Sequence, residues 1–93
     1  MKNATVEGQP EIDGDAVVLR VVVEVPELED TGGIFLCRMK GFGDTSVERL
    51  FRDLAPSADG RLRSLAAMAA LEYAASHHDQ FESLFARLAS KPA

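Results

Sequence analysis

The residues best placed to do chemistry lie between Arg38 and Ser46. Here a strand-like run passes through two glycines into Thr45-Ser46-Val47-Glu48, which has the pattern of a helix capping box. Backbone amides at such a helix N-terminus bind phosphate, and basic side chains just before it strengthen the binding. The pattern therefore supports an anion- or nucleotide-type small-ligand site in the 41–46 loop, with these candidate residues: Gly41, Gly43, Thr45, Ser46, Arg38 and Lys40.

This loop lacks the features that make a phosphate motif specific. The third glycine of the dinucleotide fingerprint is missing, as is the Gly-Lys-Ser/Thr sequence of a P-loop. Asp44 lies in the middle of the loop, where its carboxylate would repel an anion. Ordinary helix capping explains the same residues, so ligand binding is kept as the alternative hypothesis for function.

The other reactive side chains indicate no catalytic or metal site. Adjacent helical positions diverge by about 100°, so His77 and His78 cannot share a metal ion within one helix. Cys37 alternates with Phe35 and Met39 on what we expect to be a core face, where a thiol is buried and inert. We therefore assign no catalytic residue, expect no metal and no cofactor, and favour a protein that is not an enzyme.

Charge separates the chain into two parts. Residues 1–32 carry eight acidic and two basic side chains, while residues 33–93 carry seven acidic and eight basic ones, for a net charge of −5. The acidic first third disfavours binding to nucleic acid or to an anionic membrane, because both need positive charge on the protein. The single cysteine, the absence of an apolar leader and the excess of arginine over lysine favour a cytoplasmic protein of bacterial or phage origin.

Period-two alternation predicts the strands. Residues 16–25 alternate valine and leucine with mixed positions, which predicts one face in the core and one face half exposed to water. Residues 34–40 repeat this pattern after an acidic loop, and Asp13-Gly14 favours a tight turn. Pro10 cannot donate to a ladder, so residues 5–12 form an edge strand at most. We expect two or three antiparallel strands.

Three helices are expected after the strands. Val47, Leu50, Phe51 and Leu54 have helical spacing, and a similar stripe recurs beyond a cap at Asp79. Between them, the alanine-rich segment 61–77 is apolar on nearly every side, which predicts a helix buried by several neighbours. The expected fold is one two-layer α+β domain spanning residues 1–93, with residues 1–10 and 90–93 frayed.

The surplus apolar surface of the alanine-rich helix supports the main functional hypothesis. Its second stripe is either covered by the flanking helices or docks against another chain, and both alternatives stay open. We expect a non-enzymatic protein-interaction module, a homodimer that also binds another protein, such as a small regulator or antagonist. The expected interaction surface combines this stripe with the acidic loop, and its residues are Met68, Leu71, Ala75, Glu27, Glu29 and Asp30.

Overall fold

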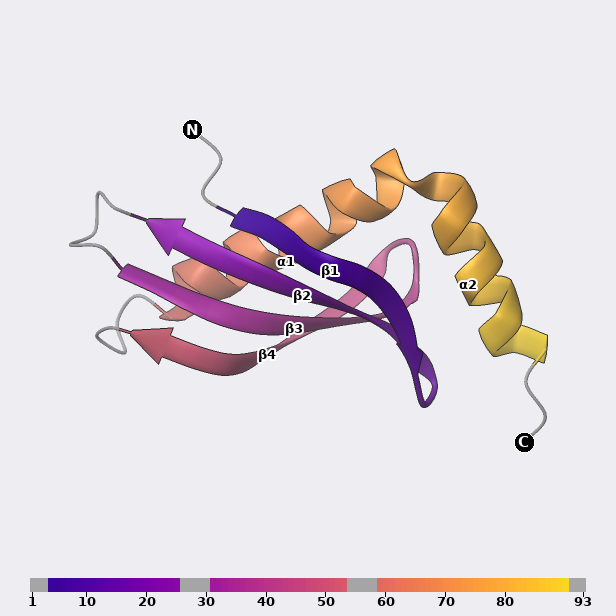
Figure 1. Ribbon diagram of the computed structural model, residues 1–93, viewed down its shortest axis with the longest axis horizontal. Coiled ribbons are helices and arrows are strands. Elements are labelled where there is room, and N and C mark those ends of the chain that lie inside the picture. The colour runs from indigo at the N-terminus through magenta and orange to yellow at the C-terminus, as the bar shows by residue number, and fades with distance from the viewer. Residues whose placement is uncertain (1–3, 26–30, 54–58, 91–93) are drawn as a thin grey trace.

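The chain forms a four-stranded antiparallel sheet with two helices packed against one face. The computed structural model describes residues 4–25, 31–53 and 59–90. The strands are β1 (Ala4–Asp13), β2 (Ala16–Val25), β3 (Thr31–Gly41) and β4 (Asp44–Asp53), and they neighbour one another in sequence order. The helices α1 (Asp59–Ser76) and α2 (His78–Ser90) follow (Figure 1).

The core lies between the sheet and α1. Every second residue of the two central strands is buried, and the buried positions of β2 and β3 pair across the ladder, as Leu19 does with Cys37. From α1, the residues Leu62, Ala66, Ala70 and Ala74 reach this core at intervals of four, which places them in one row along the helix. Three alanines in that row let the helix backbone approach the sheet closely. Phe81 is the buried residue of α2.

The expected α+β class and the antiparallel pairing are present, but the expected number of strands and helices is wrong. The strand expected at residues 16–25 is β2, and Gly14 takes the positive φ of 66° that the turn before it requires. Residues 4–10, expected to fray, belong to β1, which is an edge strand as Pro10 indicated. Residues 1–3 and 91–93 lie outside the described residues.

The helix expected after Thr45 is instead the strand β4. Gly41-Phe42-Gly43-Asp44 forms a hairpin turn, and β4 pairs with β3 from Asp44 to Asp53. The register shifts near Ile34 and Phe35, which face Phe51 and Arg49, so Leu50 is an extra residue in a bulge. Because a bulge displaces the alternation by one residue, Val47, Leu50 and Phe51 acquire helix-like spacing. Pairing with β3 satisfies that strand's backbone groups, which a helix at this position would leave open.

The central helix is not enclosed on several sides. Its row of alanines faces the sheet, while the opposite side is exposed, and 58% of the Met68 surface is accessible. Alanine is the best helix former and does not need burial, so an apolar alanine face does not require a partner. Helix α2 runs on from the end of α1 rather than lying alongside it (Figure 1).

Candidate protein-binding surfaces

The face of the sheet turned away from the helices is open (Figure 1). Four apolar side chains on it are half-buried by their neighbours in the sheet and lie outside the hydrophobic core: Val18, Val22, Ile34 and Leu36. Val22 and Ile34 face each other across the β2–β3 ladder, and Leu36 is the next residue on that face of β3. We call these four residues the apolar strip. The half-exposed face expected from the sequence of residues 16–25 is therefore part of a wider surface.

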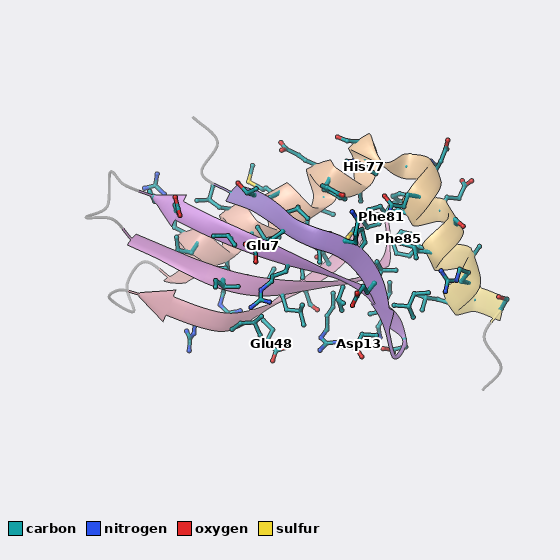
Figure 2. All side chains as sticks on the ribbon, in the orientation of Figure 1. Glu7, Asp13, Glu48, His77, Phe81 and Phe85 are labelled. Carbon is teal, nitrogen blue, oxygen red and sulfur yellow. The ribbon has the colours of Figure 1, made fainter. Side chains whose placement is uncertain are left out.

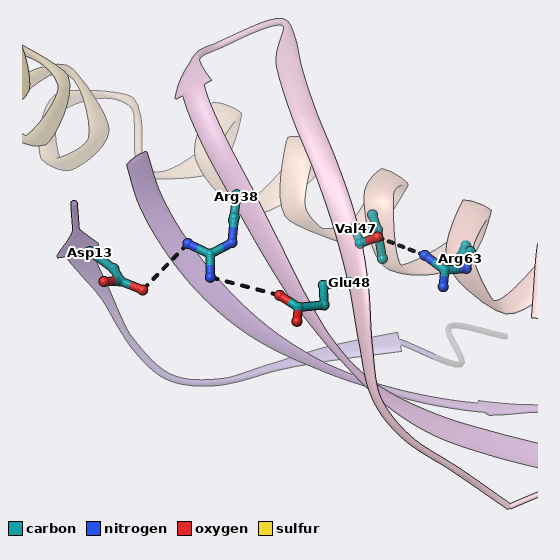
Figure 3. A network of polar contacts seen from close by, with 5 residues as sticks. All are labelled: Asp13, Arg38, Val47, Glu48 and Arg63. Atoms are coloured by element: carbon teal, nitrogen blue, oxygen red, sulfur yellow. Dashed lines mark hydrogen bonds and ion pairs between the residues drawn. The ribbon is translucent and has the colours of Figure 1, made fainter. Parts of the chain in front are cut away.

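Ion pairs cross the same face. Arg38 on β3 reaches Asp13 at 3.4 Å and Glu48 at 3.7 Å, and so connects β1, β3 and β4 (Figure 3). Arg20 lies 3.8 Å from Glu7. Glu7, Asp13 and Glu48 are labelled on this side of the ribbon in Figure 2. These pairs are largely exposed, so each contributes little to stability and is screened by salt.

Some residues of the predicted anion site do come together, but without a helix. Arg38, Lys40 and Ser46 line an open hollow of about 370 Å³ with Asp15, Ala16 and Asp44. The ammonium group of Lys40 lies 3.1 Å from Asp15, and this hydrogen bond and charge lower the pKa of the Asp15 carboxyl. The basic groups of the hollow therefore already have carboxylate partners within the chain.

The remaining residues of the predicted anion site lie elsewhere. Gly41 and Gly43 flank Phe42 in the β3–β4 hairpin. Thr45 pairs with the buried Met39, and its hydroxyl is buried with no hydrogen-bond partner among the described residues. The threonine therefore caps no helix, and the helix N-terminus on which the anion hypothesis depended is absent from this segment of the chain.

A groove separates the edge strand β1 from the second half of α1. It has a volume of about 400 Å³ and is lined by Ala4, Thr5, Val6, Ala69, Glu72, Tyr73, Ser76 and His77. Ala4 and Val6 are half-buried against the core, whereas Thr5 is exposed. The strand contributes no charged side chain to the groove. Sequence reasoning missed this site, because it depends on which strand lies at the edge and where the helix crosses it.

The two edges of the sheet differ in how they are protected. On β4, the guanidinium of Arg63 donates a 2.7 Å hydrogen bond to the carbonyl of Val47, and the bulge at Leu50 interrupts the edge (Figure 3). On β1, a bulge between Glu7 and Glu11, with Gly8 at a φ of 79°, interrupts the second half only. Charges and bulges block strand addition at sheet edges. The regular, uncharged segment from Ala4 to Val6 is the part of either described edge that these devices leave open.

The expected interaction stripe on α1 is less continuous than its sequence indicated. Met68 and Ala75 are exposed, but Leu71 is half-buried and packs against the core. The exposed Glu72 separates Met68 from Ala75 along the helix. Whether this stripe binds a partner stays a prediction. The acidic residues Glu27, Glu29 and Asp30, expected to join it, lie outside the described residues.

Aromatic contacts fix the corner where α1 meets α2. His77 stacks on Tyr73 at 3.9 Å between ring centroids, and the Nδ1 atom of His77 lies 2.9 Å from the Tyr73 carbonyl oxygen. His78 stacks in parallel on Phe42 at 4.5 Å, which ties the start of α2 to the β3–β4 hairpin. The two histidines therefore point to different neighbours, as expected for adjacent residues. His77 is also part of the lining of the β1–α1 groove.

Cys37 is buried under α1. Its thiol contacts the carbonyl oxygen of Ala66 at 3.6 Å, and burial raises the thiol pKa to about 11. A thiol with such a pKa is not a nucleophile at neutral pH. Within the described residues, no group of three or more His, Cys, Asp or Glu side chains is placed to hold a metal ion. Neither described helix is long and apolar enough to cross a membrane.

The sequence matches no protein-family model, no curated protein and no solved structure. Functional inference for this chain therefore rests on its own surfaces.

Proposed function

We propose that this protein is a non-enzymatic protein-interaction module that works as a homodimer, with the two copies paired through the open segment of β1. The observation that carries the proposal is the uncharged edge from Ala4 to Val6 beside a groove of about 400 Å³. An unprotected edge presents backbone donors and acceptors that a second strand can satisfy. The free, buried Cys37 fits a reducing compartment, so we place the module in the cytoplasm, as a small regulator or antagonist.

A two-fold axis makes this edge complementary to itself. Two copies of β1 running antiparallel would exchange backbone hydrogen bonds and continue one sheet through the dimer. The half-buried Ala4 and Val6 of each copy would then be covered by the same residues of the other copy. Additional burial is of value here, because a domain of 93 residues encloses only a modest share of its surface.

Charge favours this edge over other contact surfaces. Each copy carries a net charge of −5, so two copies repel each other where their acidic surfaces meet. The segment Ala4 to Val6 brings no charge to the contact. On the outer side of α1, Met68 is the large apolar side chain that is exposed. The apolar area there is therefore small for a stable dimer contact.

Sedimentation of the full chain tests the proposal with three arginine variants of α1. Ser76→Arg places a long cation in the groove, and Ser76 is exposed and near the helix C-terminus, where a cation is tolerated. Ser64→Arg makes the same change on an exposed position of the same helix outside the groove and serves as the matched control. Met68→Arg tests the outer stripe of α1 as the alternative seam.

We expect the wild-type chain of 10.1 kDa to sediment as a dimer at micromolar concentration. Ser76→Arg should weaken dimerisation at least about tenfold, corresponding to about 1.4 kcal/mol, while Ser64→Arg and Met68→Arg remain dimeric. A monomeric wild type at about 100 μM would overturn the proposal, because the free energy of dimerisation would then be smaller than about 5.5 kcal/mol. If Met68→Arg dissociates the dimer and Ser76→Arg leaves it intact, the dimer contact lies on the outer side of α1 and the β1 edge is not used.

A further inference from the structure

The open face of the sheet differs from the β1 edge in its charge and in its apolar side chains. We propose that this face binds a basic protein segment that carries apolar side chains between its lysines or arginines. The apolar strip of Val18, Val22, Ile34 and Leu36 supplies the apolar contact. The distribution of charge around the strip identifies the class of occupant.

Negative charge is concentrated on this face. Three basic side chains lie on it or in its hollow, namely Arg20, Arg38 and Lys40. Seven acidic side chains accompany them, namely Glu7, Glu11, Asp13, Asp15, Glu24, Asp44 and Glu48. The excess of four negative charges accounts for most of the chain's net charge of −5.

The helical layer on the opposite side carries much less negative charge. Helices α1 and α2 contain four acidic residues, Asp59, Glu72, Asp79 and Glu82, and three basic ones, Arg61, Arg63 and Arg87, for a net charge of −1. A basic partner is therefore attracted to one face of the molecule and not to the other. Nucleic acid and anionic lipid would be repelled by the same face.

The ion pairs on the face leave some of its acidic groups available. Four of the carboxylates are already paired within the chain, because Arg20, Arg38 and Lys40 contact Glu7, Asp13, Glu48 and Asp15. Glu11, Glu24 and Asp44 have no described basic side chain at ion-pair distance and are exposed. Glu11 pairs with Val18 across the β1–β2 ladder, which places a carboxylate directly beside the apolar strip.

The combination of strip and charge is more specific than an acidic surface alone. Apolar contact at the centre with complementary charge at the rim is the usual arrangement of a protein-binding surface. A basic segment without apolar side chains would gain only the screened, salt-dependent electrostatic attraction. A segment that alternates basic and apolar side chains would gain that attraction and also cover the strip.

A peptide titration of the full chain tests this proposal. The probe is a synthetic, fluorescently labelled peptide of about ten residues in which lysine alternates with leucine, a period that matches an extended strand. The control peptide has serine in place of every leucine and the same charge. Fluorescence anisotropy gives the dissociation constant at about 50 and about 300 mM NaCl, between which the screening length is more than halved.

Three protein variants separate the contributions. One neutralises the face through Glu11→Gln and Glu24→Gln, and its matched control neutralises the helical layer, away from the β1–α1 groove, through Asp79→Asn and Glu82→Gln. The third, Ile34→Thr with Leu36→Thr, removes apolar contact while keeping strand-forming residues. Circular dichroism verifies that each variant is folded.

We expect the leucine peptide to bind the wild type at least about tenfold more tightly than the serine peptide, and more weakly at high salt. The face-neutral and apolar variants should each lose about tenfold in affinity, whereas the helical control should bind as the wild type does. Equal binding of the two peptides, or equal loss in the face and helical variants, would overturn the proposal. Ser76→Arg should bind the peptide with the affinity of the wild type. The titration therefore tests the open-face site independently of whether the proposed dimer forms.

Discussion

The protection of the β4 edge by Arg63 leads to a prediction that can be worked out from one contact. The Arg63 guanidinium donates a 2.7 Å hydrogen bond to the Val47 carbonyl, and the side chain is half-buried. Arg63→Met removes the donor while keeping an apolar side chain of similar length, so the packing of the aliphatic part over the sheet is retained. The substitution should lower stability and also open a second edge.

The expected loss follows from the kind of bond. Hydrogen bonds that involve a charged group contribute about 1.5–3 kcal/mol, and partial exposure of Arg63 places it near the lower value. A loss of about 1.5 kcal/mol corresponds to a fall in Tm of roughly 6–12 °C for a domain of this size. With both edges open, copies can also add at β4, and such contacts need not close into a dimer. Species larger than those formed by the wild type should therefore appear as concentration rises.

Urea unfolding at fixed protein concentration and sedimentation over a concentration series measure the two effects. Arg61→Met is the matched control, because Arg61 is exposed on the same helix and its replacement should change stability by less than about 0.5 kcal/mol. If Arg63→Met were as stable as Arg61→Met and formed nothing larger than the wild type, the interpretation of Arg63 as an edge guard would be refuted.

Three further predictions concern the core. Thr45→Val should raise stability by about 1 kcal/mol in urea unfolding, because it removes a buried hydroxyl without a described partner, and Thr45→Ser, which keeps the hydroxyl, should not. Cys37 should resist alkylation at pH 8 in the folded protein. Because burial raises its pKa from 9.0 to about 11, only the unfolded thiol ionises between these values, so stability should fall with rising pH there, and Cys37→Ala should lack this component. Phe81→Ala should cost about 3–5 kcal/mol and expose the amides of α2 to exchange, whereas the half-buried Phe85→Ala should cost less.

The elements that sequence patterns predicted well are those whose burial is regular along the chain. Strand β2 alternates without interruption from Val17 to Val25, so period two identified the strand and its half-exposed face. Strand β4 was missed because its pattern is broken within ten residues, by the bulge at Leu50. The Gly41-Phe42-Gly43-Asp44 turn was the available signal, since a two-residue turn between runs of strand length indicates a hairpin. The capping-box pattern of Thr45-Ser46-Val47-Glu48 predicts a helix from the same segment, so the two local signals conflict.

Alanine explains why the burial of α1 could not be derived from its sequence. A side chain of one methyl group is compatible with a tight contact and with an exposed helix surface, so periodicity gives no preference between them. In the structure Ala66 and Ala70 are buried on the side of α1 that faces the sheet, while Ala75 is exposed near the end of the same helix. Bulky residues would have marked the buried row, and Leu62 alone of that row does so.

The candidate surfaces depend on contacts between residues far apart in the chain, and this limits what spacing can predict. Arg63 lies 16 residues from Val47, and Arg38 lies 25 residues from Asp13. No local pattern connects such pairs, yet the first closes one sheet edge and the second neutralises charge on the open face. With the β4 edge protected, the β1 edge is where we propose that the sheet extends, and the face carrying the acidic excess is where we propose that a different partner binds. The two surfaces can therefore be occupied at once, which is what a module that joins its own copy to another protein requires.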